Sequence, residues 1–160
     1  MTRLIAACAL ILAWGMPLSG AASAGNELVH ARNFKMDSRE ASQKKIPVMV
    51  LFSSPECHYC EQVKRIYLTP MQKDPAYRNR VIIREVTVGS TSPLTDFKGV
   101  TTTEAAFAAL NKVILVPTVK VFDTRGNEAS EAIVGLLLAD YYFGYLEAAI
   151  EEGTRKIRGK

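Results

Sequence analysis

The stretch LFSSPECHYCEQVKR, residues 51–65, places Cys57 and Cys60 with two residues between them, directly after an apolar segment. Residues 47–54, PVMVLFSS, form a continuous apolar run of strand length, which predicts a central strand covered on both faces. The pattern of the next segment, from about Pro55 to Leu68, predicts a helix. The two thiols are therefore expected where a buried strand passes into the start of a helix.

A C-x-x-C pair has three ordinary explanations: a structural disulfide, half of a metal site, or a redox dithiol. A disulfide that closes so short a loop removes little entropy from the unfolded chain, so its stabilising effect is weak. A zinc site needs about four ligands. The chain after its leader offers only Cys57, Cys60, His58 and the distant His30, with no second C-x-x-C. These counts favour the redox dithiol.

The position of the pair gives the two sulfurs different tasks. At a helix start, unpaired backbone N–H groups and the helix dipole favour an anion, so Cys57 is expected to be the nucleophilic thiolate. Cys60 lies one turn further into the helix and should be more enclosed. It can then attack the mixed disulfide at Cys57 and release the partner.

The residues around the cysteines are candidates for tuning the thiolate. His58 either stabilises the Cys57 thiolate as a neighbouring imidazole or is a surface residue of little effect. Tyr59 is expected to pack or to line the approach to Cys57. Glu56 opposes the thiolate by like-charge repulsion, which solvent screens in part.

The N-terminus has the features of a secretory signal peptide over residues 1–24. Arg3 gives a short positive region, the apolar stretch LIAACALILAW is too short to span a bilayer, and the ASA of residues 22–24 fits a cleavage site. The competing interpretation is a retained membrane anchor. If the leader is removed, Cys8 leaves with it.

Residues 25–160 have the length of one domain with its own core. Removing Arg3 from the 20 basic residues leaves 19 against 16 acidic ones, a net charge of +3. Because these charges are mixed along the chain, nucleic-acid binding is disfavoured. No apolar run after the leader is long enough for a transmembrane helix.

The remaining pattern alternates helices and strands in the first half and ends with a hairpin and a helix. A helix start is expected at Asp37, since Glu40 follows it at capping-box spacing, and Thr69-Pro70 should end or kink the helix of the cysteines. This order predicts an α/β fold, a mixed sheet with helices on both faces. The other expected elements are a lead-in at 25–36, strands at 80–88, 116–123 and 129–135, a polar connection at 89–99, a helix capped by Thr103, and a helix at 137–152.

The segment PECHYC after an apolar strand, together with VPT at residues 116–118, resembles the thioredoxin superfamily. The resemblance implies a thioredoxin-like fold for residues 25–160. It also implies that Pro117 is a cis-proline lying against the cysteine pair. Val116 would pair through its backbone with an extended substrate, and Thr118 completes the motif.

Residues 92–150 look like the second half of secreted bacterial thioredoxins associated with sulfur oxidation, the Sox type. This resemblance implies a periplasmic thiol–disulfide oxidoreductase that keeps cysteines of disulfide-bearing periplasmic proteins reduced. It would work without a metal or organic cofactor. Because the periplasm is oxidising, a membrane thiol–disulfide donor would have to restore the dithiol.

Several departures from ordinary thioredoxin leave alternatives open. Leu51 stands where thioredoxin has a buried acid, so deprotonation of Cys60 needs water or another group. Tyr59 directly before the second cysteine is similar to glutaredoxins and disulfide isomerases, which keeps glutathione use and an oxidant or isomerase activity as alternatives. A non-catalytic peptide-binding module is a further one. The extra length between Cys60 and Pro117 is expected in residues 69–79 and 89–103.

Overall fold

The computed structural model of this chain describes residues 27–136 and 138–159. The expected signal peptide of residues 1–24, with Cys8, lies outside the described residues. Within them, no helix combines the length and the apolar character needed to cross a membrane.

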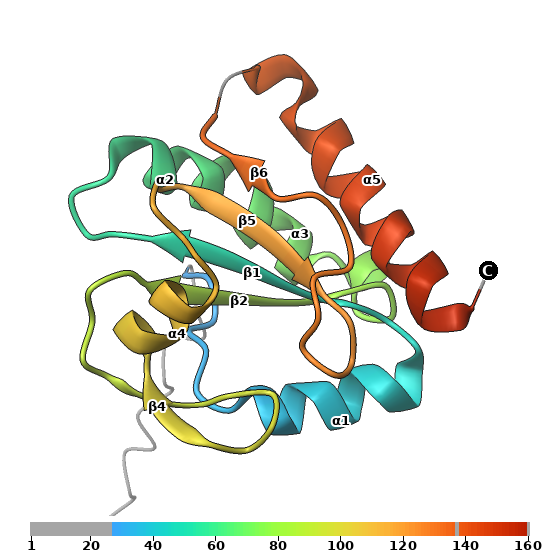
Figure 1. Cartoon of the computed structure of the whole chain (residues 1–160). Coiled ribbons are helices and arrows are strands. Elements are labelled where there is room, and N and C mark those ends of the chain that lie inside the picture. The colour runs from blue at the N-terminus through green and yellow to red at the C-terminus, as the bar shows by residue number, and fades with distance from the viewer. Residues whose placement is uncertain (1–26, 137, 160) are drawn as a thin grey trace, which may run out of the picture.

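A four-stranded mixed sheet forms the centre of the molecule (Figure 1). Strand β1 (Val48–Ser53) runs parallel to β2 (Ile82–Thr87) and antiparallel to β5 (Thr118–Phe122). Strand β6 (Ile133–Val134) pairs with β5 at the sheet edge, which gives the order β2-β1-β5-β6. The predicted mixed sheet and its C-terminal hairpin are confirmed.

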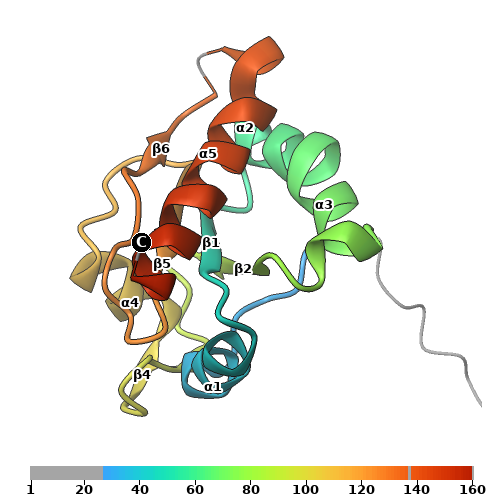
Figure 2. The same ribbon diagram turned by 90° about the vertical axis from the view of Figure 1, so that its right-hand side faces the viewer.

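Helices cover both faces of the sheet, as predicted (Figures 1 and 2). Helices α1 (Phe34–Lys44) and α4 (Glu104–Leu110) contribute to one apolar cluster, which includes Val50 and Phe52. Helix α5 (Ala139–Arg158) and the helical segment after the cysteines contribute to the other, which includes Met49 and Leu51. Neighbouring β1 residues thus face opposite clusters, which explains the unbroken apolar run.

The helix of the cysteines continues past the proline at which the sequence predicted an end or a kink. It consists of α2 (His58–Gln62), a π-helical segment η1 (Val63–Leu68) and α3 (Thr69–Lys73). The Thr69 N–H donates to the Lys64 carbonyl, five residues back. A proline disrupts an α-helical pattern because it lacks an N–H and crowds the carbonyl four residues back. The π-helical turns before Pro70 shift the backbone hydrogen bonds to carbonyls five residues back, and the helix continues through Pro70 into α3.

The start of α1 differs from the prediction. The helix begins at Phe34, because the Asn33 side chain caps it by accepting a hydrogen bond from the Met36 N–H at 3.0 Å. Asp37 lies inside the helix, where it is buried and accepts two hydrogen bonds from Arg84 on β2, at 2.6 and 3.1 Å. The predicted cap at Asp37 is therefore wrong.

The segment predicted as a polar connection contributes one strand to a small two-stranded sheet. Strands β3 (Pro93–Thr95) and β4 (Thr101–Thr103) pair antiparallel. Thr103 also caps α4, as predicted, by accepting a hydrogen bond from the Ala106 N–H at 3.2 Å. Two further differences are a short 3₁₀ helix, η2 (Pro75–Tyr77), and a return strand much shorter than residues 129–135.

Two tyrosines lie between α5 and the helix of the cysteines. The Tyr142 side chain is buried at 1% exposure, and its hydroxyl has no hydrogen-bond partner among the described residues. Burial raises the pKa of this hydroxyl far above its usual range. The neighbouring Tyr67 ring lies 4.9 Å away, and its hydroxyl donates to the Ala139 carbonyl at 2.7 Å.

Tyr142→Phe should raise the free energy of unfolding by about 1 kcal/mol, because it removes a buried polar group that has no partner. Tyr67→Phe, the matched control, should lower it by a similar amount, since it removes a hydrogen bond that is made. Urea denaturation of the oxidised proteins measures both changes. Destabilisation by Tyr142→Phe would contradict this account of the hydroxyl.

Candidate functional site

The two cysteines form a disulfide with unequal exposure. Their sulfurs are 2.09 Å apart, and their Cα atoms 5.1 Å. Cys57 is half-buried, whereas Cys60 is fully buried. Solvent and a partner can therefore approach the pair from the Cys57 side.

Cys57 is the N-cap residue of α2. After β1 ends, the Ser54 carbonyl accepts a hydrogen bond from the Cys57 N–H at 3.2 Å, which turns the chain into the helix. The Cys57 sulfur then accepts from the Cys60 N–H at 3.1 Å. The sulfur occupies the position of a capping oxygen, where helix N–H groups and the helix dipole favour negative charge.

Glu56, His58 and Tyr59 all lie on the surface around the disulfide. The His58 ring contacts the Gln62 amide at 2.8 Å, one turn along the same helix. Tyr59 is 58% exposed, so it lies on the surface rather than in the core. The roles of these three residues in tuning the thiolate stay predictions.

The segment Val116–Pro117–Thr118 enters the sheet at the end where β1 leaves it. The Val116–Pro117 peptide bond is cis. Thr118 is the first residue of β5 and pairs with Phe52 of β1. Its hydroxyl donates to the Leu115 carbonyl at 2.8 Å, which closes the turn before the strand. The part of this segment in substrate binding stays a prediction.

A buried acid that the sequence reasoning missed lies on β2 next to this end of β1. Glu85 is the register partner of Leu51, and its side chain is 4% exposed. It accepts a hydrogen bond from the Ser53 hydroxyl at 2.5 Å. The sequence signal was the one acidic residue in the strand of residues 80–88, which also holds two arginines. The position of thioredoxin's buried acid is Leu51 here, and the buried acid of this chain lies beside it on the neighbouring strand.

Lys64, one helical turn after Cys60, neutralises this acid. Its Nζ lies 3.1 Å from Glu85 and 2.5 Å from Glu61. Burial lowers the pKa of Lys64, but its hydrogen bonds and charge interactions with the two carboxylates outweigh burial and raise it. The lysine therefore stays charged. Its ion pair with Glu85 joins the helix of the cysteines to β2.

His30 completes this charged cluster at the sheet edge. Its ring nitrogens lie 3.6 Å from Glu85 and 3.8 Å from the buried Glu104. Across the described residues, however, no group of three or more His, Cys, Asp or Glu side chains is arranged to hold a metal ion.

Glu85→Gln should lower the free energy of unfolding by about 3 kcal/mol, because it leaves the half-buried Lys64 charge without its buried partner. Glu61→Gln, a matched control that removes the exposed partner of the same lysine, should cost less than about 1 kcal/mol. Urea denaturation of the oxidised proteins gives both values. If both variants lose the same free energy of unfolding, the buried Lys64–Glu85 pair stabilises the fold no more than the exposed pair does.

A family model described as a thioredoxin-like domain matches residues 34–150, which include both cysteines and Pro117. A search of the curated proteins gave no match.

Solved structures that are similar to this chain include two thioredoxins and one thioredoxin-fold protein. Thioredoxin from Trichomonas vaginalis is 17% identical, with a TM-score of 0.51 over 78% of this chain and 96% of that one. A thioredoxin-fold protein from Helicobacter pylori is 14% identical, with a TM-score of 0.50 over 77% and 93%. Oxidised mitochondrial thioredoxin 3 from Saccharomyces cerevisiae is 17% identical, with a TM-score of 0.49 over 78% and 94%.

At these identities, the first two structures support the fold alone. The family model covers most of the described chain, from the start of α1 into α5. It does so with the cysteine pair in place at the start of α2. The chain therefore belongs to the thioredoxin-like domain family, as a thiol–disulfide oxidoreductase with Cys57 and Cys60 as its redox pair.

Proposed function

We propose that this protein is a periplasmic reductant of protein disulfides that maintains or reactivates proteins of sulfur oxidation. The observation that carries the dithiol mechanism is the unequal burial of the two cysteines, with Cys57 half-buried at the helix start and Cys60 fully buried behind it. One sulfur is accessible to a partner, and the other is accessible only to its neighbour.

The reaction begins with the reduced dithiol. The Cys57 thiolate attacks one sulfur of the partner's disulfide, the partner's S–S bond breaks, and its other sulfur leaves as a thiolate that takes up a proton. Cys60 then loses its proton and attacks the Cys57 sulfur of the mixed disulfide, which releases the second partner thiol. Two electrons pass to the partner, and the Cys57–Cys60 disulfide forms.

The partner is guided by the backbone before β5. Val116 precedes the cis bond to Pro117 and is half-buried. In the proposed complex, its backbone groups pair with an extended segment of the partner, and Thr118 holds the turn through its bond to Leu115. A segment bound in this way would present its disulfide to Cys57.

The cellular setting rests on the sequence. The leader of residues 1–24 supports export, and the likeness of residues 92–150 to Sox-type thioredoxins supports periplasmic sulfur oxidation. A membrane thiol–disulfide donor would return the disulfide to the dithiol. A retained anchor instead of a cleaved leader would keep the same site on the periplasmic side.

A second candidate function is that of a disulfide oxidant, isomerase or glutaredoxin-like enzyme. It is favoured by His58, which lies exposed beside Cys57 and could stabilise the thiolate, and by Tyr59 before Cys60. Stabilising the thiolate makes the disulfide a stronger oxidant. The reduction potential separates the two functions.

Cys60→Ser should accumulate mixed disulfides through Cys57 with periplasmic proteins, because the resolving sulfur is missing. Cys57→Ser, the matched control, should trap far fewer, since its remaining sulfur is buried. Non-reducing electrophoresis and mass spectrometry of the trapped species measure this. If no Cys57-linked species forms with any exported protein, the mechanism is wrong. A different result would favour a non-catalytic binding module: the protein has no disulfide reductase activity, and Cys57→Ala binds peptides as well as the unaltered protein does.

Equilibration with glutathione should give a reduction potential more negative than about −230 mV, beyond the range of glutaredoxins. The ratio of dithiol to disulfide at each glutathione ratio can be followed by alkylation and mass spectrometry. A value near −180 or −120 mV, typical of an isomerase or a strong oxidant, would assign the second function instead.

A further inference from the structure

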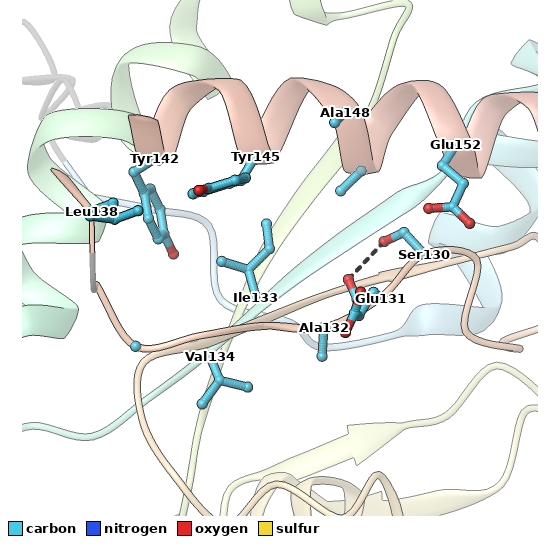
Figure 3. Close-up of a pocket in the computed structure, with 12 residues that line it drawn as sticks. Ser130, Glu131, Ala132, Ile133, Val134, Leu138, Tyr142, Tyr145, Ala148 and Glu152 are labelled. Atoms are coloured by element: carbon cyan, nitrogen blue, oxygen red, sulfur yellow. Dashed lines mark hydrogen bonds between the residues drawn. The ribbon is translucent and has the colours of Figure 1, made fainter. Parts of the chain in front are cut away.

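An elongated groove lies between α5 and the chain segment that contains β6 (Figure 3). Residues Ser130–Gly135 form one side of this β6–α5 groove, and side chains of α5 form the other. Its volume is about 400 Å³, within the range of ligand sites. Figure 3 shows Tyr142 extending from α5 toward the opposite segment, and Tyr145 lying along the helix on the side that faces Ile133. The central part of the groove is therefore apolar.

One end of the groove adjoins the redox site. Val134 pairs with Thr118, and the Gly135 N–H donates to the Pro117 carbonyl at 2.8 Å. Figures 1 and 2 show β6 and the first turns of α5 at the same end of the molecule as α2. A polypeptide that lies beside Val116 can therefore continue directly into the groove.

The groove also follows an open sheet edge. Strand β6 is the last strand of the central sheet, and in the described chain only β5 pairs with it. Edge strands offer unpaired backbone groups to an extended segment. A groove lined by six consecutive residues, two of which form this edge strand, suits a polypeptide better than a compact small molecule.

The other end of the groove is acidic. Glu131 is exposed and Glu152 is half-buried, and Figure 3 shows both at the end opposite Leu138. Glu152 also pairs with Lys156 at 3.3 Å on the exposed side of α5. Two carboxylates in a chain of net charge +4 form a local negative region, which favours a basic side chain of the occupant.

We propose that the β6–α5 groove binds the disulfide-bearing substrate beyond its cysteine and selects an apolar residue followed by Lys or Arg. The apolar side chain lies over Ile133 against Tyr145 and Ala148, and the basic one reaches Glu131 and Glu152. Three residues of extended substrate span about 10 Å, so a substrate alongside this segment would place its basic residue roughly three residues beyond the one next to Val134. This selection rests on the proposed disulfide reductase activity.

The test uses short peptides whose single cysteine is joined to thionitrobenzoate, a coloured thiol released when Cys57 attacks. In one peptide set, a Leu-Lys pair is placed at successive positions before and after the cysteine. In the control set, a Ser-Glu pair replaces Leu-Lys at each of these positions. The best Leu-Lys peptide should react about five times faster than its Ser-Glu counterpart with the reduced protein. The measured quantity is the second-order rate constant of colour release.

Two variants test the two ends of the groove. Glu131→Lys should remove the preference for Lys, whereas Glu151→Lys, an exposed α5 residue outside the groove, should keep it. Ala148→Trp should fill the apolar part and slow the Leu-Lys peptides roughly tenfold. Each variant should reduce the thionitrobenzoate disulfide itself at the unaltered rate.

The outcomes separate this proposal from the function on which it rests. Normal reaction with the small disulfide but equal rates for all peptides would overturn the groove proposal and leave the reductase intact. Loss of reaction with every disulfide by the unaltered protein would overturn both. A dimer in sedimentation that Ala148→Trp dissociates would show that a second copy occupies the groove, which also overturns the proposal.

Discussion

Burial of β1 on both faces is the constraint on which the structure depends. None of its six residues is more than 2% exposed, and it pairs with β2 on one side and with β5 on the other. Its side chains alternate between the two apolar clusters, so any shift in register would exchange their surroundings. The strand therefore fixes where the chain emerges, and Cys57 follows at that point.

The end of β1 brings the parts of the site together. The helix start holds Cys57, β5 begins beside it at Thr118, and the carboxylate of Glu85 lies on the opposite side of β1 from β5. Lys64 connects that carboxylate with the helix, so the redox pair lies on a support fixed by a buried charge pair. On the β5 side, β6 extends the same region into the β6–α5 groove.

Local sequence signals predicted most elements, and failed where tertiary contacts decide. The apolar run of β1 and the cap at Thr103 depend on periodicity and on near neighbours, and both are correct. The start of α1 was misplaced because Asp37, a good capping residue, pairs with Arg84 instead. The three-residue strands β3 and β4 were missed because short polar strands carry no periodic signal.

The sequence by itself determined the order of strand, cysteine pair and helix, and with it the position of Cys57 at the helix start and of Cys60 one turn further in. These properties follow from the spacing of neighbouring residues, which the chain carries into any fold. Only the tertiary structure decided which acid is buried beside the end of β1 and where a groove opens. Ser53 and Glu85 meet across 32 residues of sequence through the register of two strands. Contacts of this kind arise from the packing of distant segments, which no local pattern records.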